Sequence, residues 1–504
     1  MCVHHRSMQL RARTIVNVRK KVHVQMARRQ DDGAHCQHHA SCVCNCKVCD
    51  RDEWESSSTL RGFLDTVMCP RLPGERHYDL KCVLGKCASC GFDEHFQICP
   101  VEQRAMGMYY PCRFLANRTQ YSSSGKAKEV KVEVTTDVTW RNFLEDTKRE
   151  LVSFRIHDFV ARWQAQLYHD MFEWLPQDCE MWISDYIENF KCFSKIEIQQ
   201  EFYNRSSISI FICLVIRRRR ADEPIGAGVG DYHLPDRLAC DVHVFVSDDK
   251  THDAGMACHA WEEVANWTIK KTGKMPRFVS HWTDGAPNQF KFTLPIWFLN
   301  AFYRKYEGHG LRHLWWLFFA SCHGKGMQDA AGAWIKSVVA RAILLGGVIN
   351  DLRTFAQYCE ECLLMARQAP IGKRRKPLTS NRIIHVVEED TIAAYRAALP
   401  TATTWGKDTK STFGSLRQNH MFFAVPEENR VGRRWVGCLC DSCAPTDEGP
   451  RFSECCNANR FLVDGENVNK TVEKTIKVVY RSSHSHADDI GESLKVPPLI
   501  PFRA

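Results

Sequence analysis

The chain has 504 residues, 44% of them hydrophobic and 25% charged, and its formal net charge is +9. This composition is that of a globular protein with room for several domains, and it excludes a fibrous or wholly disordered chain. No uncharged apolar run approaches the roughly 18 residues of a membrane span, and the basic start lacks the apolar core of a secretory signal. We therefore expect an intracellular protein without a membrane partner. The modest positive charge suits nucleic acid as a partner, although many proteins without one share it.

Cysteine and histidine crowd the region that follows a basic tail, residues 1–33. In a reducing compartment such clusters are more often zinc sites than disulfides, so we expect structural zinc in residues 34–112. Two C-x₂-C pairs stand there, Cys46–Cys49 and Cys87–Cys90, and two such pairs can form one tetrahedral thiolate site. An incidental cysteine-rich loop is the alternative. The candidate zinc ligands of this region are Cys46, Cys49, Cys69, Cys82, Cys87 and Cys90.

Residues 113–175 are predicted to be a helical connector, because apolar residues between Trp140 and Tyr168 recur at roughly helical spacing. Residues 176–350 then alternate between strand-like and helix-like patterns. The predicted strands are 180–185, 207–216, 241–246, 277–284 and 311–320, and the predicted helices are 255–271, 288–306 and 328–345. Three consecutive strands followed by alternation is the order of the ribonuclease-H-like fold. We expect an α/β core with a mixed sheet flanked by helices, and small zinc-stabilised elements on either side of it.

Three acidic residues occupy the ends of these predicted elements. Asp185 ends the first strand, Asp284 ends the fourth, and Asp329 opens the third helix. Singly they are explained as a strand-end turn, an Asp-Gly turn and a favourable acid in a first helical turn. Together they predict a site for Mg²⁺ or Mn²⁺, since clustered carboxylates repel one another until a hard cation binds them. His323 and Lys325 flank the turn before Asp329 and are candidate phosphate contacts.

Three further regions complete the chain. Residues 351–425 are predicted to be a helical and basic extension, in which Lys373, Arg374 and Arg375 form a nuclear import signal, a phosphate contact or simply an exposed loop. Residues 426–462 hold a second cysteine cluster, and residues 463–504 form a tail with one strand-like run, 471–479. The weaker zinc candidates of the second cluster are Cys438, Cys440, Cys443 and Cys455.

Several blocks of this sequence resemble those of transposon-derived proteins with a DDE-type, ribonuclease-H-like core. The blocks are Asp185–Phe190 (DYIENF), Glu197–Tyr203 (EIQQEFY), Thr283–Lys291 (TDGAPNQFK) and Ser321–Lys336 (SCHGKGMQDAAGAWIK), with looser likeness at Lys81–Gly91 and Arg434–Cys443. Ala330 and Ala333 replace glycines of the family pattern, and the third acid is Asp329 rather than the Glu common in DDE enzymes. No clear site-specific DNA-binding domain precedes the first cysteine cluster.

The resemblance implies a transposase or nuclease that cleaves DNA and transfers the strand with a divalent metal held by the acidic triad. DNA would be the partner, the nucleus the location, and no small-molecule cofactor would be needed; a homo-oligomer is left open. Two other functions remain open from the sequence. One is a nuclear DNA-binding protein that keeps the fold without catalysis, and the other is a zinc-dependent protein-interaction module.

Overall fold

The computed structural model covers the whole chain and divides it into two compact units. Unit 1 comprises residues 1–163 and 459–467, and unit 2 comprises residues 164–458 and 468–504. The residues that the structure describes are 6–15, 17–18, 60–71, 77–95, 98, 103–121, 127–192, 207–223, 234–286, 289–291, 293–320, 326–368, 381–399, 416–426, 430–446, 449–455 and 457–475.

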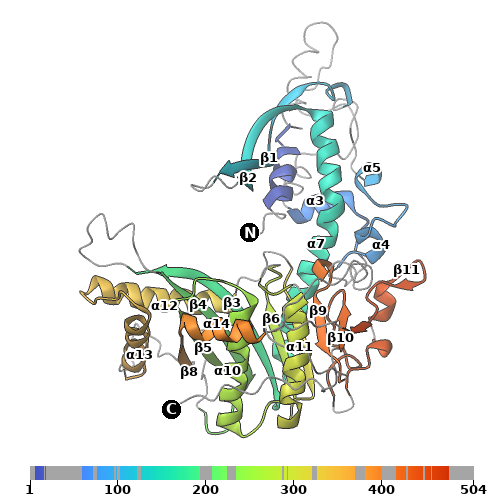
Figure 1. Ribbon diagram of the computed structural model, residues 1–504. Coiled ribbons are helices and arrows are strands. Elements are labelled where there is room, and N and C mark those ends of the chain that lie inside the picture. Colours follow the sequence, from blue (N-terminus) through green and yellow to red (C-terminus); the bar gives the residue numbers. More distant parts are fainter. Residues whose placement is uncertain are drawn as a thin grey trace, which may run out of the picture. The chain divides into compact units, whose positions relative to one another are not determined.

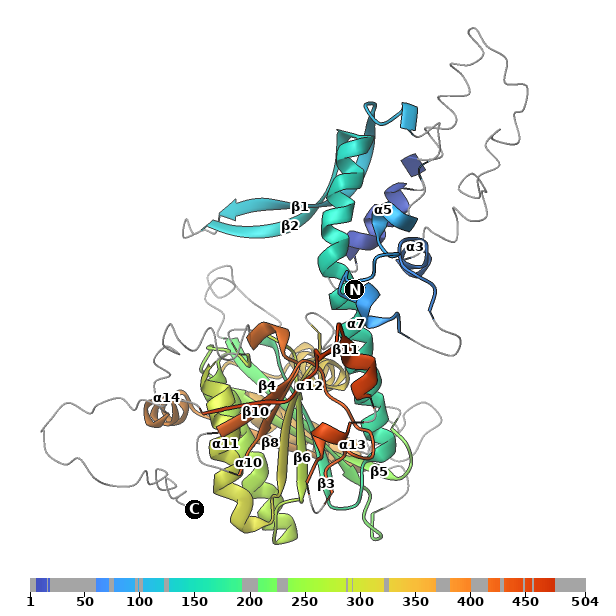
Figure 2. The same cartoon turned by 90° about the vertical axis from the view of Figure 1, so that its right-hand side faces the viewer.

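Unit 1 is built from short helices, a long hairpin and most of one long helix (Figures 1 and 2). Its elements are α3 (Leu60–Val67), α4 (Leu80–Val83), α5 (Phe92–His95), β1 (Tyr109–Tyr121), β2 (Ala127–Thr139), α7 (Trp140–Trp174, shared with unit 2), η5 (from Ala458 to Phe461), β11 (Leu462–Val463) and β12 (Glu466–Asn467). The helical prediction for residues 113–175 is therefore wrong for its first part, where β1 pairs with β2 along its whole length. In β2, Val130, Val132 and Val134 alternate with charged residues, which is the period of a strand.

In the described part of unit 2, nine strands form one mixed sheet in the order β13-β10-β9-β7-β6-β3-β4-β5-β8. The strands are β3 (Cys179–Lys191), β4 (Ser207–Arg218), β5 (Leu238–Ser247), β6 (Phe278–Thr283), β7 (His313–Phe318), β8 (Asn381–Val387), β9 (Met421–Ala424), β10 (Arg430–Arg434) and β13 (Val472–Thr475). β3 runs parallel to β6, and β6 parallel to β7. β4 lies antiparallel between β3 and β5. The prediction of an α/β core with a large mixed sheet flanked by helices is confirmed at this level.

The helices of unit 2 cover both faces of the sheet (Figure 1). They are α10 (Ala254–Thr272), α11 (Thr293–Tyr306), η2 (Glu307–His309), α12 (Met327–Leu344), α13 (Leu352–Gln368), α14 (Glu389–Ala398), η3 (Leu416–Gln418) and η4 (Phe452–Glu454). One buried cluster joins α7, α12 and α13 to one face, and a second joins α10, α11 and α14 to the other. The long apolar strands follow from this, because a sheet covered on both faces has no polar side.

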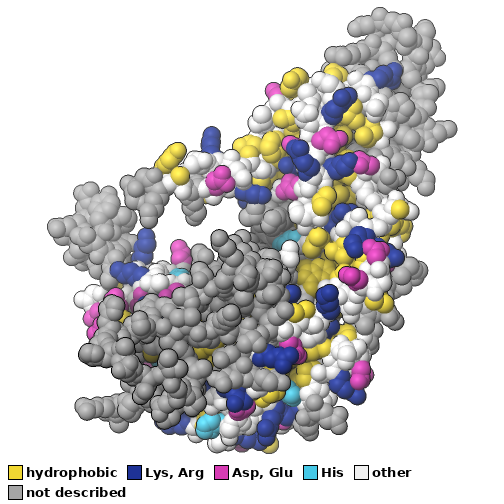
Figure 3. Space-filling view, turned by 45° about the vertical axis from the view of Figure 1, so that its right-hand side comes forward, with side chains coloured by type: hydrophobic (Ala, Val, Ile, Leu, Met, Phe, Trp, Pro, Cys, Tyr) yellow, Lys and Arg dark blue, Asp and Glu magenta, His cyan; other side chains and the backbone are white. Residues whose placement is uncertain are grey.

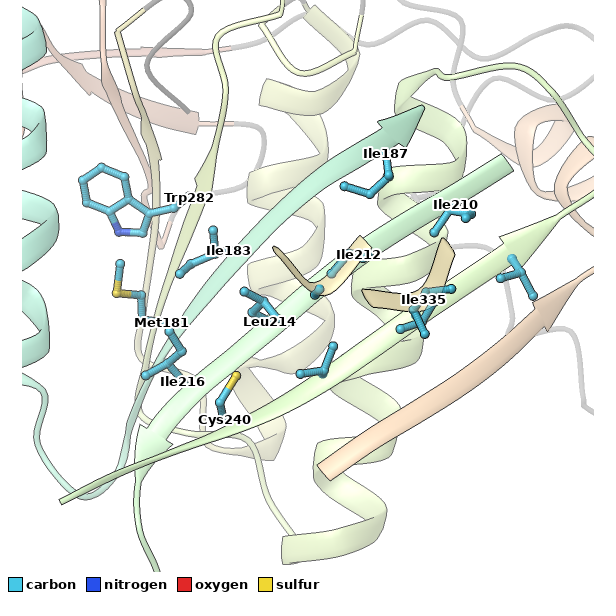
Figure 4. Close-up of a cluster of buried hydrophobic side chains, with 14 of the residues drawn as sticks. Met181, Ile183, Ile187, Ile210, Ile212, Leu214, Ile216, Cys240, Trp282 and Ile335 are labelled. Atoms are coloured by element: carbon cyan, nitrogen blue, oxygen red, sulfur yellow. The ribbon is translucent and has the colours of Figure 1, made fainter. Parts of the chain in front are cut away.

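Side-chain alternation assigns each residue of β3 to one face. Met181, Ile183 and Ile187 belong to the cluster under α12, whereas Trp182 and Tyr186 belong to the cluster under α10 and α11. Figure 4 shows the first cluster, with Ile335 of α12 beside the aliphatic side chains of the central strands. Asp185 has the same parity as Ile183 and Ile187, so it belongs to the α12 face of the sheet.

The structure differs from the predicted elements in several places, both within the sheet and at its margins. β3 continues for six residues past Asp185, so this residue lies within a strand and does not end one. The region 351–425 contains β8, α14 and β9 in addition to the expected helix. β9 and β10 have only four and five residues, too short for a period to emerge. The run 471–479 is a strand over Val472–Thr475, and residues 476–479 lie outside the described residues.

Candidate functional site

Asp185 and Asp284 come from neighbouring parallel strands at the same level of the sheet. β3 and β6 are paired in a register that sets Ile183 opposite Trp282. Two residues further along each chain stand Asp185 and Asp284, and adjacent strands lie about 4.8 Å apart. Asp284 directly follows β6, and its Oδ1 accepts a hydrogen bond of 3.1 Å from the backbone N–H of Ala286. The side chain is thereby fixed at the carboxyl end of the strand.

Helix α12 crosses the same face and carries Asp329 in its first turn. The helix approaches β3 so closely at Gly332 that a Cβ there would lie 2.6 Å from Cγ1 of Ile187. Gly332 follows Asp329 by three residues, which is one helical turn, and Ile187 follows Asp185 by two, which is the same face of the strand. The side chain of Gln328 hydrogen-bonds to Asp185, so the start of α12 contacts the strand acid directly.

The electrostatics of Asp185 show that the three acids share one environment. Burial, together with the negative charges of Asp284 and Asp329, raises the pKa of Asp185 to about 7, against hydrogen bonds from the backbone of Tyr186 and the side chain of Gln328 that lower it. Burial also raises the pKa of Asp284. A buried carboxyl with like charges beside it gains from any cation that enters the group.

The three carboxylates are nevertheless not gathered as tightly as a filled metal site requires. Among the described residues, only two cysteine groups bring three or more potential ligand atoms within 4.8 Å of one another. Oδ2 of Asp329 instead accepts a hydrogen bond of 2.9 Å from the backbone N–H of Gly326, at the start of the helix. Glu188, three residues past Asp185, has a side chain that is 94% exposed and lies 3.5 Å from Lys336. It points to solvent rather than to the acids.

Lys291, in the turn that follows Asp284, is buried beside Phe318, which belongs to the cluster on the α10 and α11 face of the sheet. The backbone N–H groups of Gln289, Phe290 and Lys291 all donate to the carbonyl of Ala286, which folds the chain back on Asp284. A Cβ at Gly285 would lie 4.0 Å from Nζ of Lys291. The lysine is 5% exposed, its Nζ lies 5.0 Å from the centre of the Phe318 ring, and burial lowers its pKa to about 7.

The first cysteine group lies in unit 1, around α4. Sγ atoms of Cys69, Cys82 and Cys87 lie within 4.8 Å of one another, and Sγ of Cys69 is 3.9 Å from that of Cys87. Sγ of Cys90 accepts a hydrogen bond of 3.4 Å from the backbone N–H of Cys69, which makes it a fourth neighbour. Burial raises the pKa of the Cys69 thiol to about 11, so a metal must displace protons to bind. The group could hold a metal such as zinc.

The second cysteine group lies in unit 2, after β10. Sγ atoms of Cys438, Cys440, Cys443 and Cys455 lie within 4.8 Å of one another. Two side chains donate toward the sulfurs: Nδ2 of Asn457 lies 3.2 Å from Cys438, and Nη1 of Arg434 lies 3.5 Å from Cys443. Donors of this kind favour the thiolate form that binds metal. All four candidates of the second cluster therefore meet in one place and could hold a metal such as zinc.

Other predicted site residues lie outside the described residues. They are Cys46, Cys49, His323, Lys325, Lys373, Arg374 and Arg375. Conversely, the sequence patterns did not single out two residues that the structure brings to the acids or to the strand that carries one of them: Gln328 and Gly332. Both belong to the same block as Asp329. Their position in this block is the sequence feature that could have identified them as part of the site.

Comparison with known proteins gives one match. A family model described as a domain of unknown function (DUF8701) matches residues 164–369. No curated protein and no solved structure matches the chain. Among the described residues, no helix is both long and apolar enough to cross a membrane. The matched segment begins where unit 2 begins and contains Asp185, Asp284, Lys291 and Asp329, so the chain resembles that family over the whole acidic site.

Proposed function

We propose that unit 2 cleaves and transfers DNA strands by divalent-metal-dependent chemistry at Asp185, Asp284 and Asp329. The observation that carries the proposal is the register of β3 and β6, which sets two acids side by side on the face that α12 crosses with the third. The central order β7-β6-β3-β4-β5, with β3, β6 and β7 parallel and β4 antiparallel, is the order that a ribonuclease-H-like core would have. This order supports that fold for the segment.

The residues fit a hard divalent cation by the chemistry of their donors. Three carboxylates offer oxygen, the ligand that Mg²⁺ and Mn²⁺ prefer, and the pKa of Asp185 is raised first by burial and then by the charges of Asp284 and Asp329, so a cation at this point would stabilise its charged form. Asp185 and Asp284 would bind from the strands, and Asp329 would turn from the backbone of Gly326 toward them. When bound, such ions activate a nucleophilic oxygen and stabilise charge on the attacked phosphate.

The remaining residues would position the acids. Gln328 would hold Asp185 through its hydrogen bond, and Gly332 would set the distance between α12 and β3. Substrate DNA implies action in the nucleus, where the reaction would first use water and then a 3′-hydroxyl as nucleophile.

The two cysteine groups would serve this function as structural zinc sites. Each gathers thiols from segments with few hydrophobic contacts of their own, and metal binding supplies the folding free energy that such segments lack. Their contribution would be to stabilise each unit rather than to take part in the reaction.

The test is nicking of a supercoiled plasmid in Mg²⁺ or Mn²⁺ by the zinc-replete protein. We expect nicking by the wild type and loss of at least 100-fold for Asp284→Asn, by the scale on which essential catalytic groups act. Glu188→Gln, which removes an exposed carboxylate nearby, is the matched control and should nick like the wild type. Nicking that survives in Asp284→Asn would refute the proposal. Intact DNA binding without nicking by any variant would favour the non-catalytic DNA-binding protein.

A further inference from the structure

A small hollow in unit 1 lies between α7 and the segment that carries the first cysteine group. Arg71 and Tyr78 line it from that segment, and Arg155, Asp158, Phe159 and Arg162 line it from α7. Its volume is about 10 Å³, which admits one water-sized group. None of these residues belongs to the acidic site or to the cysteine group.

Two of the three arginines in the hollow have carboxylate partners. Nε of Arg162 lies 2.7 Å from Oδ2 of Asp158. Nη2 of Arg71 lies 3.3 Å from Oδ1 of Asp65, and the Arg71 guanidinium stacks 5.3 Å from the centre of the Tyr78 ring. The Tyr78 hydroxyl donates to the same Asp65 oxygen at 2.6 Å. Asp65 and Asp158 are therefore both already paired with an arginine.

Arg155 is the exception. The residue is 8% exposed, its Nε has no hydrogen-bond partner, and no ion pair among the described residues includes it. Its Nη2 lies where a Cβ of Gly85 would be only 2.7 Å away, so the guanidinium packs under the turn between Cys82 and Cys87. Gly85 has a φ of +71°, a conformation that glycine adopts without strain. The glycine therefore lets the backbone of the turn lie against the Arg155 guanidinium, which keeps this charge buried.

Among the arginines and carboxylates of the hollow, one positive charge has no carboxylate partner. Arg71, Arg155 and Arg162 contribute three, and Asp65 and Asp158 contribute two of opposite sign. On the face of the molecule in Figure 3, Lys and Arg side chains are interspersed with Asp and Glu. A buried unpaired guanidinium is costly, and proteins retain such a group where a ligand supplies the counter-charge.

We infer that the hollow around Arg155 binds one phosphate oxygen of a DNA backbone. A phosphodiester carries a single negative charge, which equals the unbalanced charge, and the small volume admits an oxygen while the sugar and base stay outside. Arginine suits this role because its planar fork matches phosphate geometry. The choice of DNA as the source of the phosphate rests on the proposed function; the anion site itself does not.

The test uses three full-length, zinc-replete variants: Arg155→Met, Arg155→Lys and Arg149→Met. Arg149 lies on the same helix with a side chain that is 78% exposed, so its loss removes the same charge outside the hollow. Two quantities are measured without added Mg²⁺ or Mn²⁺. One is the rise in melting temperature caused by inorganic phosphate, and the other is the salt dependence of binding to a labelled DNA duplex.

We expect Arg155→Met to melt no lower than the wild type, because it removes an unpaired buried charge, yet to lose the phosphate-induced rise. Its slope of log K against log salt should fall by about 0.9, the value of one phosphate contact. Arg155→Lys should keep a reduced rise, and Arg149→Met the full rise. An equal rise in all variants would overturn the inference, as would an Arg155→Met protein that fails to fold. A phosphate effect that persists in a protein unable to nick DNA would leave the anion site standing and refute only the proposed function.

Discussion

Asp185 and Asp284 stand side by side on adjacent parallel strands, each two residues beyond the paired Ile183 and Trp282. This relationship follows from strand register alone and does not depend on side-chain rotamers. It places two carboxylates on one face of the sheet, under the helix that carries Asp329. The resulting repulsion destabilises the metal-free protein, which gives the site a measurable signature before any reaction is assayed.

Asp185→Asn should stabilise the metal-free protein at pH 7. The amide keeps the shape and the hydrogen-bonding capacity of the side chain, but it removes a buried charge from beside Asp284 and Asp329. We expect a gain on the order of 2 kcal/mol in the free energy of unfolding, measured by urea denaturation. Glu188→Gln, the exposed neighbour, should change stability by less than about 0.5 kcal/mol. A destabilised Asp185→Asn protein would show that repulsion among the three carboxylates does not limit the stability of the metal-free protein.

Gly332→Ala should push α12 away from β3. An added methyl would meet Ile187 at 2.6 Å, so the helix or the strand has to move, at a cost of about 1–3 kcal/mol. Calorimetric melting of the single variant and of the double variant with Ile187→Ala measures the effect. The second change removes the obstacle, so the double variant should lose less stability than the two single losses added together. Gly308→Ala, where no atom lies within 4 Å, is the control and should be neutral.

Each cysteine group should hold one zinc ion, so single substitutions should remove one equivalent each. We expect Cys82→Ser and Cys443→Ser to contain one zinc fewer per chain than the wild type, by elemental analysis of purified protein. Cys362→Ser, a cysteine of α13 outside both groups, should keep the wild-type content. Full zinc content in Cys443→Ser would exclude the second group as a metal site.

The histidine pair of β5 and β8 should destabilise unit 2 as the pH falls from about 6.5 to about 4, a contribution opposite in sign to that of Asp185, whose raised pKa favours the folded state in this range. Nδ1 of His243 on β5 lies 3.0 Å from Nε2 of His385 on β8, and burial lowers the pKa of both, that of His385 to about 4. The unfolded chain, in which histidine has a pKa near 6.5, then binds more protons than the folded one, so each histidine lowers stability by up to about 1.4 kcal/mol per pH unit. Above pH 6.5 this contribution is constant.

Urea denaturation at pH 7.5 and pH 5 measures this pH dependence. His385→Gln should reduce the difference between the two pH values, whereas substitution of the exposed His169 by Gln should leave it unchanged. Equal differences in the wild type and in His385→Gln would contradict the argument. The pair matters for the fold because, among the described strands, β8 stands at the end of the sheet order and pairs with β5 alone.

The central part of the fold was predictable because its signals are local and strong. β4 and β5 are nearly continuous apolar runs, and α10 begins at the N-cap Asp253 and ends at Gly273 with a φ of +80°. The sequence does not predict the hairpin β1–β2, because the strong helical pattern of α7 directly follows it and dominates the region 113–175. The sequence does not predict β8, β9 and β10, because these segments lack a clear alternation of apolar and polar residues. They become strands through hydrogen-bonded pairing with other strands of the sheet.

The candidate acids were predictable from their blocks, but their geometry was not. The sequence pattern suggested that Asp185 ends a strand, whereas it lies within β3 and is positioned by register with β6. The environment of Lys291 and the contact of Gly332 with Ile187 depend on tertiary packing, which no local pattern reports. The grouping of Cys69 with Cys82 and Cys87 likewise depends on how the segment after α3 folds onto α4 and the turn that follows it.

The most direct test of the acidic site is calorimetric titration of Mn²⁺ into zinc-replete, full-length protein. The account predicts saturable Mn²⁺ binding by the wild type and by Glu188→Gln. Asp185→Asn and Asp284→Asn should remain folded and lose that binding. A folded wild type that binds no Mn²⁺, or variants that bind it as well as the wild type does, would contradict the claim that these carboxylates form a metal site.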